Sequence, residues 1–363
     1  MLKFKKILAL SLIPQYLIVQ FFSYYPETIE TVYSNFLYEY ISTFLRSISS
    51  KIPFAIGDTF YLSAIIFFIY WVITNIKTPK KLFIEIFASI SVIYFFFNIS
   101  WGLNYYRIPI HKQVKTNNYS YEDLNKFTTE LIKKINKLHI ELTLNDSLKV
   151  VIPYNFKENS KITTDNYVKL AKNNMNNSII RSIKSISNFT SNDNIENIKG
   201  SIISIPLSYM GFSGYLNPFT HEYNINALIP NNSMPMVMSH EVAHEIGFAS
   251  EMEANFIGYI SLISSDDLYH QYFGHSFALI QCLNEIQKSK TEIYNSYLAS
   301  TNRGVLENYR EIFEFWNNYN SPFEPIIKKI YDYFLKVNKV EDGIRNYNQS
   351  LSLILNYNGF YND

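Results

Sequence analysis

Three long apolar runs near the amino end constrain what this chain can fold into more than any other feature. They cover residues 7–24, 60–76 and 82–101. Each approaches the roughly 20 residues that an α-helix needs to cross the hydrocarbon core of a bilayer. Buried helices of a water-soluble core are the alternative, but three such runs gathered at one end of a chain favour a membrane. We therefore expect a membrane anchor over residues 1–102 and a separate domain over residues 103–363.

The first run also has the basic lead of a signal peptide, because MLKFKK precedes it. A cleaved signal peptide ends in small residues, and the sequence YYPETIE that follows this run lacks them. We therefore expect the first run to be retained as a span.

The distribution of lysines predicts how the spans are oriented. Lysines precede the first run and occupy the short hairpin between the second and third: Lys3, Lys5, Lys6, Lys77, Lys80 and Lys81. The loop between the first two runs has only Arg46 and Lys51. Basic residues near spans favour the cytoplasmic side. The pattern predicts a cytoplasmic amino end and hairpin, with the carboxyl domain outside the cytoplasmic membrane.

The remaining segments indicate a mainly α fold with a small β element. Residues 29–48 repeat apolar side chains at helical spacing, which predicts an amphipathic helix that lies on the outer membrane face or packs on the spans. We take packing as the expectation. Residues 121–142 and 165–186 are predicted helices, and the chain beyond Gly247 is again helical in pattern. Short strands are expected at 149–153 and 223–230.

Composition limits the partners and the covalent chemistry. The formal net charge of +1 gives no bulk attraction to nucleic acid, so no nucleic-acid partner is expected. The single cysteine, Cys282, excludes an internal disulfide and a multi-cysteine zinc site. We expect it to be a small buried apolar residue.

The sequence SHEVAHEIGFASEMEANF contains the strongest chemical signal. His240, Glu241 and His244 form an H-E-x-x-H pattern. Residues i and i+4 share one face of an α-helix, so the two imidazoles can hold one Zn²⁺ ion. The glutamate between them can act as the general base toward a water at the metal. The alternative is a polar helix with two exposed histidines.

A site with two histidines needs a third protein ligand, and two acids compete for that role. Gly247 can end the first helix in a left-handed conformation and turn the chain back. Ser250 and Glu253 match an S-x-x-E capping box, which gives Glu253 a structural task. Glu251 shares a helix face with Asn255, whose amide could steady a metal-bound carboxylate. We therefore predict that Glu251 is the ligand, with Glu253 as the alternative.

Several nearby polar residues have plainer interpretations. The segment 222–230 is either an edge strand that binds an extended peptide or ordinary structure. We expect Glu245, His270 and His275 to be solvated. Tyr209 and Tyr215 are able to donate to an oxyanion, but packing is the better expectation in a chain with 30 tyrosines.

Two resemblances extend this interpretation. HEVAH followed by E-x-E-A-N resembles the gluzincin peptidases, and in their related E-x-x-A-[DN] pattern the first glutamate is the ligand. WGLNYYRIP, SYMGFSGYLNPFTHEYNIN, the H-E-x-x-H segment and YFLKVNKVEDGIRNYNQSL resemble domain-of-unknown-function family 3810, bacterial membrane proteins regarded as candidate zinc peptidases. This resemblance implies a zincin-like domain behind three spans, and it brings no substrate. His221 departs from the family pattern, so we do not expect it to be a ligand.

These observations predict a zinc-dependent metallopeptidase anchored in the bacterial cytoplasmic membrane, with Glu241 as general base and a peptide or protein as substrate. Its partners would be that substrate and the lipid bilayer. An intramembrane protease is a rival, but the segment around the motif is too charged for a clean span. A catalytically inactive protein that binds metal or a partner on the same scaffold is the other alternative.

Overall fold

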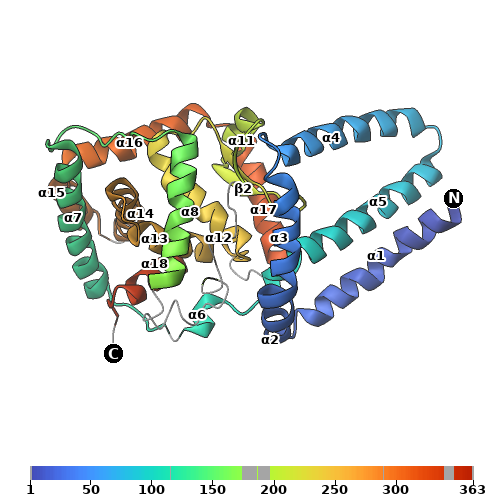
Figure 1. The fold of residues 1–363 in the computed structure, drawn as a ribbon, viewed down its shortest axis with the longest axis horizontal. Helices are drawn as coiled ribbons and strands as arrows, with labels where there is room; N and C mark the ends of the chain where they lie inside the picture. The colour runs from blue at the N-terminus through green and yellow to red at the C-terminus, as the bar shows by residue number, and fades with distance from the viewer. Residues whose placement is uncertain are drawn as a thin grey trace.

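The fold has two parts, a helical body and an arm of long helices that projects from it (Figure 1). It comes from a computed structural model that describes residues 2–114, 116–173, 186, 197–288, 290–338 and 347–361. The arm consists of α1 (Leu2–Phe22), α4 (Ile56–Asn75) and α5 (Pro79–Ser100). The body is built around α7, α12, α13 and α14, whose apolar side chains share one core.

The elements of the amino-terminal half, besides the arm, are α2 (Pro26–Thr28), η1 (Ile29–Leu37), α3 (Tyr38–Ser49), η2 (Gly102–Tyr106), α6 (Ile110–Gln113), α7 (Tyr121–Thr143) and α8 (Phe156–Asn173). The carboxyl-terminal half contributes β1 (Ile198–Ser201), α11 (Ser204–Met210), β2 (Gly214–Leu216), β3 (Tyr223–Asn226), η4 (Asn231–Ser233), α12 (Met234–Glu245), α13 (Glu251–Ile263), α14 (Leu268–Gln287), α15 (Thr291–Ser300), α16 (Arg303–Asn318), α17 (Glu324–Val337) and α18 (Tyr347–Tyr357).

The arm agrees with the prediction of apolar spans. Helices α4 and α5 are each long and apolar enough to cross a membrane. The first run passes the same test only together with the segment Pro26–Ser49, at a bend of 94°, so the described chain has two or three candidate spans. Side chains of α1 and α5 bond along their length, with Ser11 and Ser91 hydroxyls 3.0 Å apart. Helix α4 packs much less closely on α5, and the two ribbons run apart from each other (Figure 1).

The segment between the first two candidate spans packs in the opposite sense to the one expected. Its polar side chains face the body and are buried: Glu30, Ser34, Ser42, Arg46 and Ser49. Ile29, Tyr33 and Tyr38 are buried with them, but most of the large apolar side chains are exposed: Val32, Phe36, Leu37, Tyr40, Phe44 and Ile48. Residues 29–48 are therefore helical and amphipathic, as predicted, but the packed face is the polar one.

The small β element is a three-stranded sheet in the order β1-β3-β2. Strand β3 pairs parallel with β1 and antiparallel with β2, with Ile225 opposite Gly200 on one side and Gly214 on the other. The predicted strand 223–230 thus ends at Asn226. Because β3 lies in the centre, the structure contradicts the edge-strand alternative for residues 222–230 and agrees with ordinary structure, and β2 holds an edge instead. Residues 149–153 do not form a strand.

Helix α7 confirms the prediction for residues 121–142. Ser120 and Asp123 form a capping box at its start, and Leu144 adopts a left-handed conformation just after its end. The other predicted helix is shifted, because α8 begins at Phe156 rather than 165. Residues 174–185 of that prediction lie outside the described part of the chain.

Two buried carboxylates attach the start of α4 to the sheet region. Glu222 accepts hydrogen bonds from the backbone N–H groups of Ile56 and Gly57, at 3.0 and 2.6 Å. Asp58 accepts from Ser201 Oγ at 2.7 Å and from the Tyr215 hydroxyl. Carboxylates are favourable at a helix amino terminus, where backbone N–H groups lack partners. The position of α4 is therefore set by the body.

Candidate metal centre

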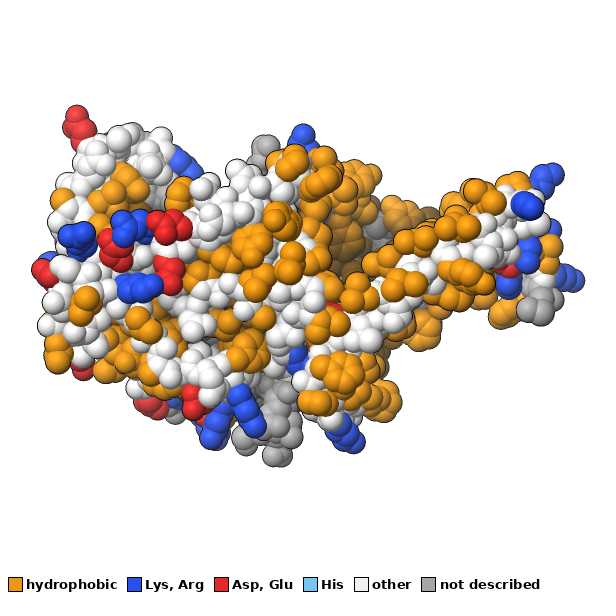
Figure 2. All heavy atoms as spheres, turned by 90° about the horizontal axis from the view of Figure 1, so that it is seen from above, with side chains coloured by type: hydrophobic (Ala, Val, Ile, Leu, Met, Phe, Trp, Pro, Cys, Tyr) orange, Lys and Arg blue, Asp and Glu red, His pale blue; other side chains and the backbone are white. Residues whose placement is uncertain are grey.

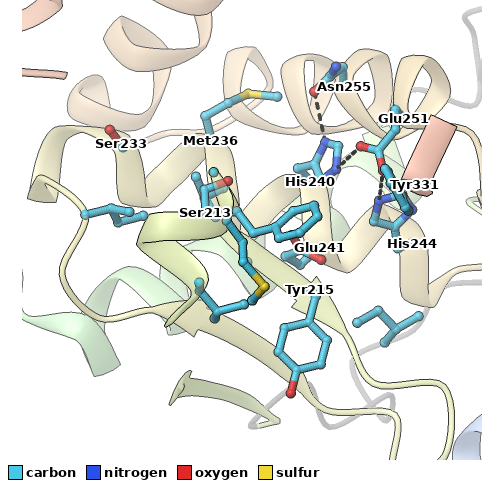
Figure 3. Close-up of a pocket in the computed structure, with 18 of the residues that line it drawn as sticks. Ser213, Tyr215, Ser233, Met236, His240, Glu241, His244, Glu251, Asn255 and Tyr331 are labelled. Carbon is cyan, nitrogen blue, oxygen red and sulfur yellow. Dashed lines mark hydrogen bonds and ion pairs between the residues drawn. The ribbon is translucent and has the colours of Figure 1, made fainter. Parts of the chain in front are cut away.

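The H-E-x-x-H residues lie on the last two turns of α12, as their spacing predicts. The helix ends where Gly247 adopts a φ of 97°, in the left-handed region that favours glycine. The Gly247 N–H then bonds to the carbonyl of His244 at 2.9 Å, and the Phe248 N–H bonds to that of Ala243 at 3.2 Å. This turn leads directly into α13, so Glu251 lies opposite the two histidines (Figure 3).

Both histidines are held through their Nδ1 atoms. His244 Nδ1 lies 2.7 Å from the carbonyl oxygen of Phe248, which can only accept, so this nitrogen carries the proton. His240 Nδ1 lies 2.9 Å from Asn255 Oδ1 and donates to it. In a neutral imidazole the other nitrogen, Nε2, then presents a lone pair. Asn255 therefore supports His240, not Glu251 as the sequence had suggested.

The lone pairs meet at Glu251. Its carboxylate oxygens lie 3.1 Å from His240 Nε2 and 3.8 Å from His244 Nε2. One ligand atom from each of the three residues falls within 4.8 Å of the others. Three electron-rich atoms in such a group require a cation or added protons between them. The cluster thus has the donor types and the spacing of a metal site.

Tyr331 of α17 completes the surroundings of the cluster, and sequence reasoning missed it. Its hydroxyl donates to Glu251 Oε1 at 2.6 Å (Figure 3). A hydrogen bond of this kind orients a ligand carboxylate. The residue lies 80 positions after Glu251 in a chain rich in tyrosine, and no local pattern distinguishes it.

The electrostatics of the cluster follow from burial and proximity. Burial alone would raise the pKa of Glu251, but its hydrogen bonds with His240 and His244 hold that pKa well below its usual range. Burial likewise would lower the pKa of His244, yet the hydrogen bond and charge of Glu251 raise it to about 9. The cluster therefore attracts positive charge strongly.

Glu241 lies beside this cluster with one oxygen unused. Its side chain is buried, and no protein group bonds to Oε2 among the described residues. Burial raises the pKa of Glu241, while His240 and His244 act in the opposite direction. Gly214 of β2 leaves room for this carboxylate, because a Cβ at that position would lie 2.8 Å from Glu241 Oε1 and would displace it. No local pattern in the sequence distinguishes Gly214.

The structure contradicts the capping role that we expected for Glu253. Ser250 precedes α13 without a side-chain cap. Glu253 is buried and accepts a hydrogen bond from the backbone N–H of Ile110 at 2.5 Å. Burial raises the pKa of Glu253 to about 7, against the opposing effect of that hydrogen bond. Glu253 thus fixes the start of α6, and it is not part of the cluster.

Three residues that we expected to be solvated are buried. Glu245 forms an ion pair with Arg46 of α3 at 3.0 Å, and both side chains are shielded from solvent. His270 is fully buried, with Nδ1 3.0 Å from Asn166 Nδ2, and His275 is buried in α14. His221 is outside the cluster, as expected, with Nε2 3.2 Å from the carbonyl of Ser100. Cys282 is buried, as predicted.

A cavity of about 940 Å³ opens over the cluster. Its lining includes His240, Glu241, His244 and Glu251, together with the edge strand β2. Most of the remaining lining is apolar or aromatic. Helices α14 and α16 contribute much of it, and the rest includes Tyr61 of α4, Phe97 of α5, Leu207 and Met210 of α11, and Phe334 of α17. Cavities of this size and character are typical of ligand sites.

Fold and site together define a mainly helical protein. Its described residues include two or three apolar helices that could anchor it in a membrane and a His–His–Glu cluster that could hold a metal ion. The family model described as "Protein of unknown function (DUF3810)" matches residues 33–355, and the chain belongs to that family. The family resemblance of the sequence is thereby confirmed. Searches of curated proteins and of solved structures found no match.

Proposed function

We propose that this protein is a membrane-anchored, zinc-dependent peptidase whose site lies outside the cytoplasmic membrane. One observation carries the proposal: His240, His244 and Glu251 converge at a cavity in which Glu241 has an unused carboxylate oxygen. The orientation rests on the lysines of the amino end and the hairpin.

The residues present fit zinc. Two imidazole nitrogens with fixed tautomers and one carboxylate form the ligand set of many catalytic zinc sites, which leave a position for water. Asn255, the Phe248 carbonyl and Tyr331 supply the outer hydrogen bonds that such ligands require. When bound, zinc would polarise the scissile carbonyl and make a nearby water more acidic.

The residues of the chain would perform the proton transfers. Glu241 would take a proton from the water as the water oxygen bonds to the carbonyl carbon of the peptide. It would then give that proton to the peptide nitrogen as the C–N bond breaks, which yields a carboxylate and an amine. The raised pKa of Glu241 suits a group that must both accept and release a proton.

Strand β2 offers a way to align the peptide. It is an edge strand, and Gly214, Tyr215 and Leu216 all line the cavity. An extended peptide could add to this edge through backbone hydrogen bonds. The combination of edge strand, α12 and α13 is the basis for proposing a zincin-like arrangement.

A catalytically inactive metal-binding scaffold is the alternative. The unpaired oxygen of Glu241 favours the enzyme, because a purely structural metal site has no use for a buried carboxylate without a partner. Gly214, which leaves room for that carboxylate, supports the same conclusion.

Metal analysis combined with peptide cleavage tests the proposal. The purified full-length protein should contain about one zinc per chain, and His240→Ala, His244→Ala and Glu251→Ala should lose it. Glu241→Gln should retain zinc and lose turnover by roughly 10²- to 10⁴-fold on a randomised peptide library. Glu122→Ala, at an exposed carboxylate of α7, is the matched control. Full turnover in Glu241→Gln, or zinc retained in Glu251→Ala, would overturn the assignment.

A further inference from the structure

We propose that the substrate is a polypeptide held in the bilayer by an apolar anchor, and that it reaches the site sideways from the membrane, between α4 and α5. This inference rests on the proposed peptidase function and names the substrate class for the same site. The anchor could be an acyl chain or an apolar helix, since both present the same chemistry to the protein.

The first observation is the depth of the site. Trp101 directly follows the last residue of α5, and its Nε1 donates to the carbonyl of His244 at 3.2 Å. Its ring also packs edge-on to the His244 imidazole. A candidate ligand is therefore in contact with the end of a candidate span. The scissile bond must lie close to the level at which α5 leaves the membrane.

The second observation concerns α3, which packs near α5 and contacts the carboxyl end of α12. The Tyr38 hydroxyl bonds to the carbonyl of Glu245 at 2.6 Å, and Arg46 pairs with the Glu245 carboxylate. The outward face of α3 and the preceding η1 is apolar, with Phe36, Tyr40 and Phe44 exposed. A helix whose polar side is buried and whose apolar side is exposed is suited to a lipid surface. Its bend of 94° from α1 would lay it along that surface.

Helix α17 repeats this arrangement next to the cluster. Tyr331 bonds to Glu251, whereas Ile326, Ile330 and Tyr333 are exposed. Phe334 of the same helix packs against Phe97 of α5, with ring centroids 6.1 Å apart. Helix α3, which contacts the end of α12, and α17, which contacts Glu251, thus both present apolar side chains outward.

The third observation is that the cavity reaches two spans. Helix α4 packs much less closely on α5 than α1 does, and the α4 and α5 ribbons run apart from the hairpin to the body (Figure 1). Tyr61 of α4 and Phe97 of α5 both line the cavity, so its wall continues onto the facing spans. Seen from above, an apolar hollow separates the arm from the body, and Lys and Arg side chains gather at the far tip of the arm (Figure 2).

The rest of α4 has no partner among the described residues that covers its apolar side chains. From Phe60 to Ile76 its large apolar residues are mostly exposed, while its first turn is fixed by Glu222 and Asp58. The space beside α4 meets the cavity that contains the cluster at Tyr61, which lines that cavity. An anchored substrate would place its apolar segment in this space and its adjoining polar chain at Glu241. We choose this occupant because the space leads to the site.

The test uses the full-length protein in phosphatidylcholine–phosphatidylglycerol vesicles. Randomised peptides are supplied in three forms: free, carrying a palmitoyl chain, or joined to an apolar helix of about 20 residues. Cys282 is buried, so a cysteine introduced at Tyr61 can be labelled selectively with a photo-crosslinker. The labelled Tyr61→Cys protein also carries Glu241→Gln, which keeps peptides intact. Phe21→Cys is the matched control, at an exposed aromatic of α1 outside the cavity.

We expect anchored peptides to crosslink from position 61 and not from position 21. This result is expected for the palmitoyl chain, the apolar helix or both. We also expect Phe97→Ala to lower the preference for anchored over free peptides about tenfold, with no change in Phe21→Ala. The protein and the anchored peptide are concentrated in the same membrane to the same extent in both variants. Comparing Phe97→Ala with Phe21→Ala therefore removes that effect. Equal crosslinking from both positions, or crosslinking at 61 only to a second copy of this chain, would overturn lateral entry.

The two proposals fail in distinguishable ways. A protein without zinc, or with zinc and no cleavage of any peptide, contradicts the peptidase function whatever the crosslinking shows. Cleavage of free and anchored peptides at equal kcat/KM, with zinc present, contradicts only the substrate class. Preference for one anchor form over the other supports the inference and identifies the source of the anchor.

Discussion

Helix α7 and the η1–α3 segment are both amphipathic, but they bury opposite faces. Helix α7 buries Leu124, Phe127 and Leu131 and exposes charged residues, as a helix on a water-soluble body does. The η1–α3 segment buries charged and hydroxyl groups, together with Ile29, Tyr33 and Tyr38, and exposes most of its other aromatic and aliphatic side chains. The spacing of apolar residues therefore predicts an amphipathic helix in both segments, but it does not show which face packs against the rest of the protein. What differs is the surrounding medium, water for α7 and, as we propose, lipid for α3.

The largest effect that would test this contrast comes from the buried charges. Arg46→Ala leaves the Glu245 carboxylate without its ion-pair partner in a shielded site. We expect a loss of about 4 kcal/mol in the free energy of unfolding, measured by denaturant titration in detergent micelles. Lys126→Ala removes an exposed ion pair of α7 and should change it by less than about 1 kcal/mol. Similar losses in both variants would show that the two buried faces do not differ in this way.

For a matched pair of phenylalanines we expect the opposite order, with the larger loss of stability on α7 and the smaller one on α3. Phe127 is 3% exposed on α7, and Phe44 is 64% exposed on α3. Phe127→Ala should cost about 3 kcal/mol, because it leaves a cavity that the neighbouring Phe360 ring fills only in part. Phe44→Ala should cost less than about 1 kcal/mol, since no packed cavity forms. The same denaturant titration measures both.

Fluorescence can distinguish lipid from water at the exposed positions. A dye on a cysteine introduced at Phe44 should be quenched by nitroxide-labelled lipid, whereas one introduced at the exposed Lys133 of α7 should not. Quenching at both positions, or at neither, would contradict the difference in medium.

The smallest expected effect is a dependence of stability on pH, which comes from a buried histidine in the helical body. His275 lies in α14, which packs against α7, and burial lowers its pKa to about 3, with a contribution from Lys134. The unfolded chain, with an ordinary pKa near 6.5, binds the proton more readily, so stability falls as the pH drops below that value. At pH 5 this histidine should cost about 2 kcal/mol relative to pH 8. His275→Leu should flatten the pH profile of unfolding by that amount, and an unchanged slope would show that His275 is not responsible.

Local patterns in the sequence predicted what depends on nearby residues. The i, i+4 spacing placed His240 and His244 on one face, and Gly247 turned the chain so that Glu251 came opposite them. The apolar runs predicted the arm by length alone. These features need no knowledge of the distant chain.

Long-range partners account for what the sequence could not predict. The capping box assigned Glu253 to Ser250, but the N–H that it accepts belongs to Ile110, 143 positions earlier. Glu245 was expected on the surface because glutamate is rarely buried alone, and its partner Arg46 could not be identified from local sequence. Tyr331 was missed for the same reason. The burial of the polar face of α3 could not be predicted, because the spacing of apolar residues does not show which face of a helix is buried.

The attachment of α4 to Glu222 has a consequence for how the protein is made. The carboxylate that bonds to the first N–H groups of this helix lies 166 residues later in the chain. At roughly 5–20 residues per second, the ribosome completes α4 on the order of ten seconds or more before Glu222 exists. During that interval Glu222 is not available to the helix, and the first backbone N–H groups of α4 must bond to water or to other groups. The final angle of α4 is therefore decided late in biosynthesis, when β3 forms and the carboxylate arrives, rather than when the helix enters the membrane.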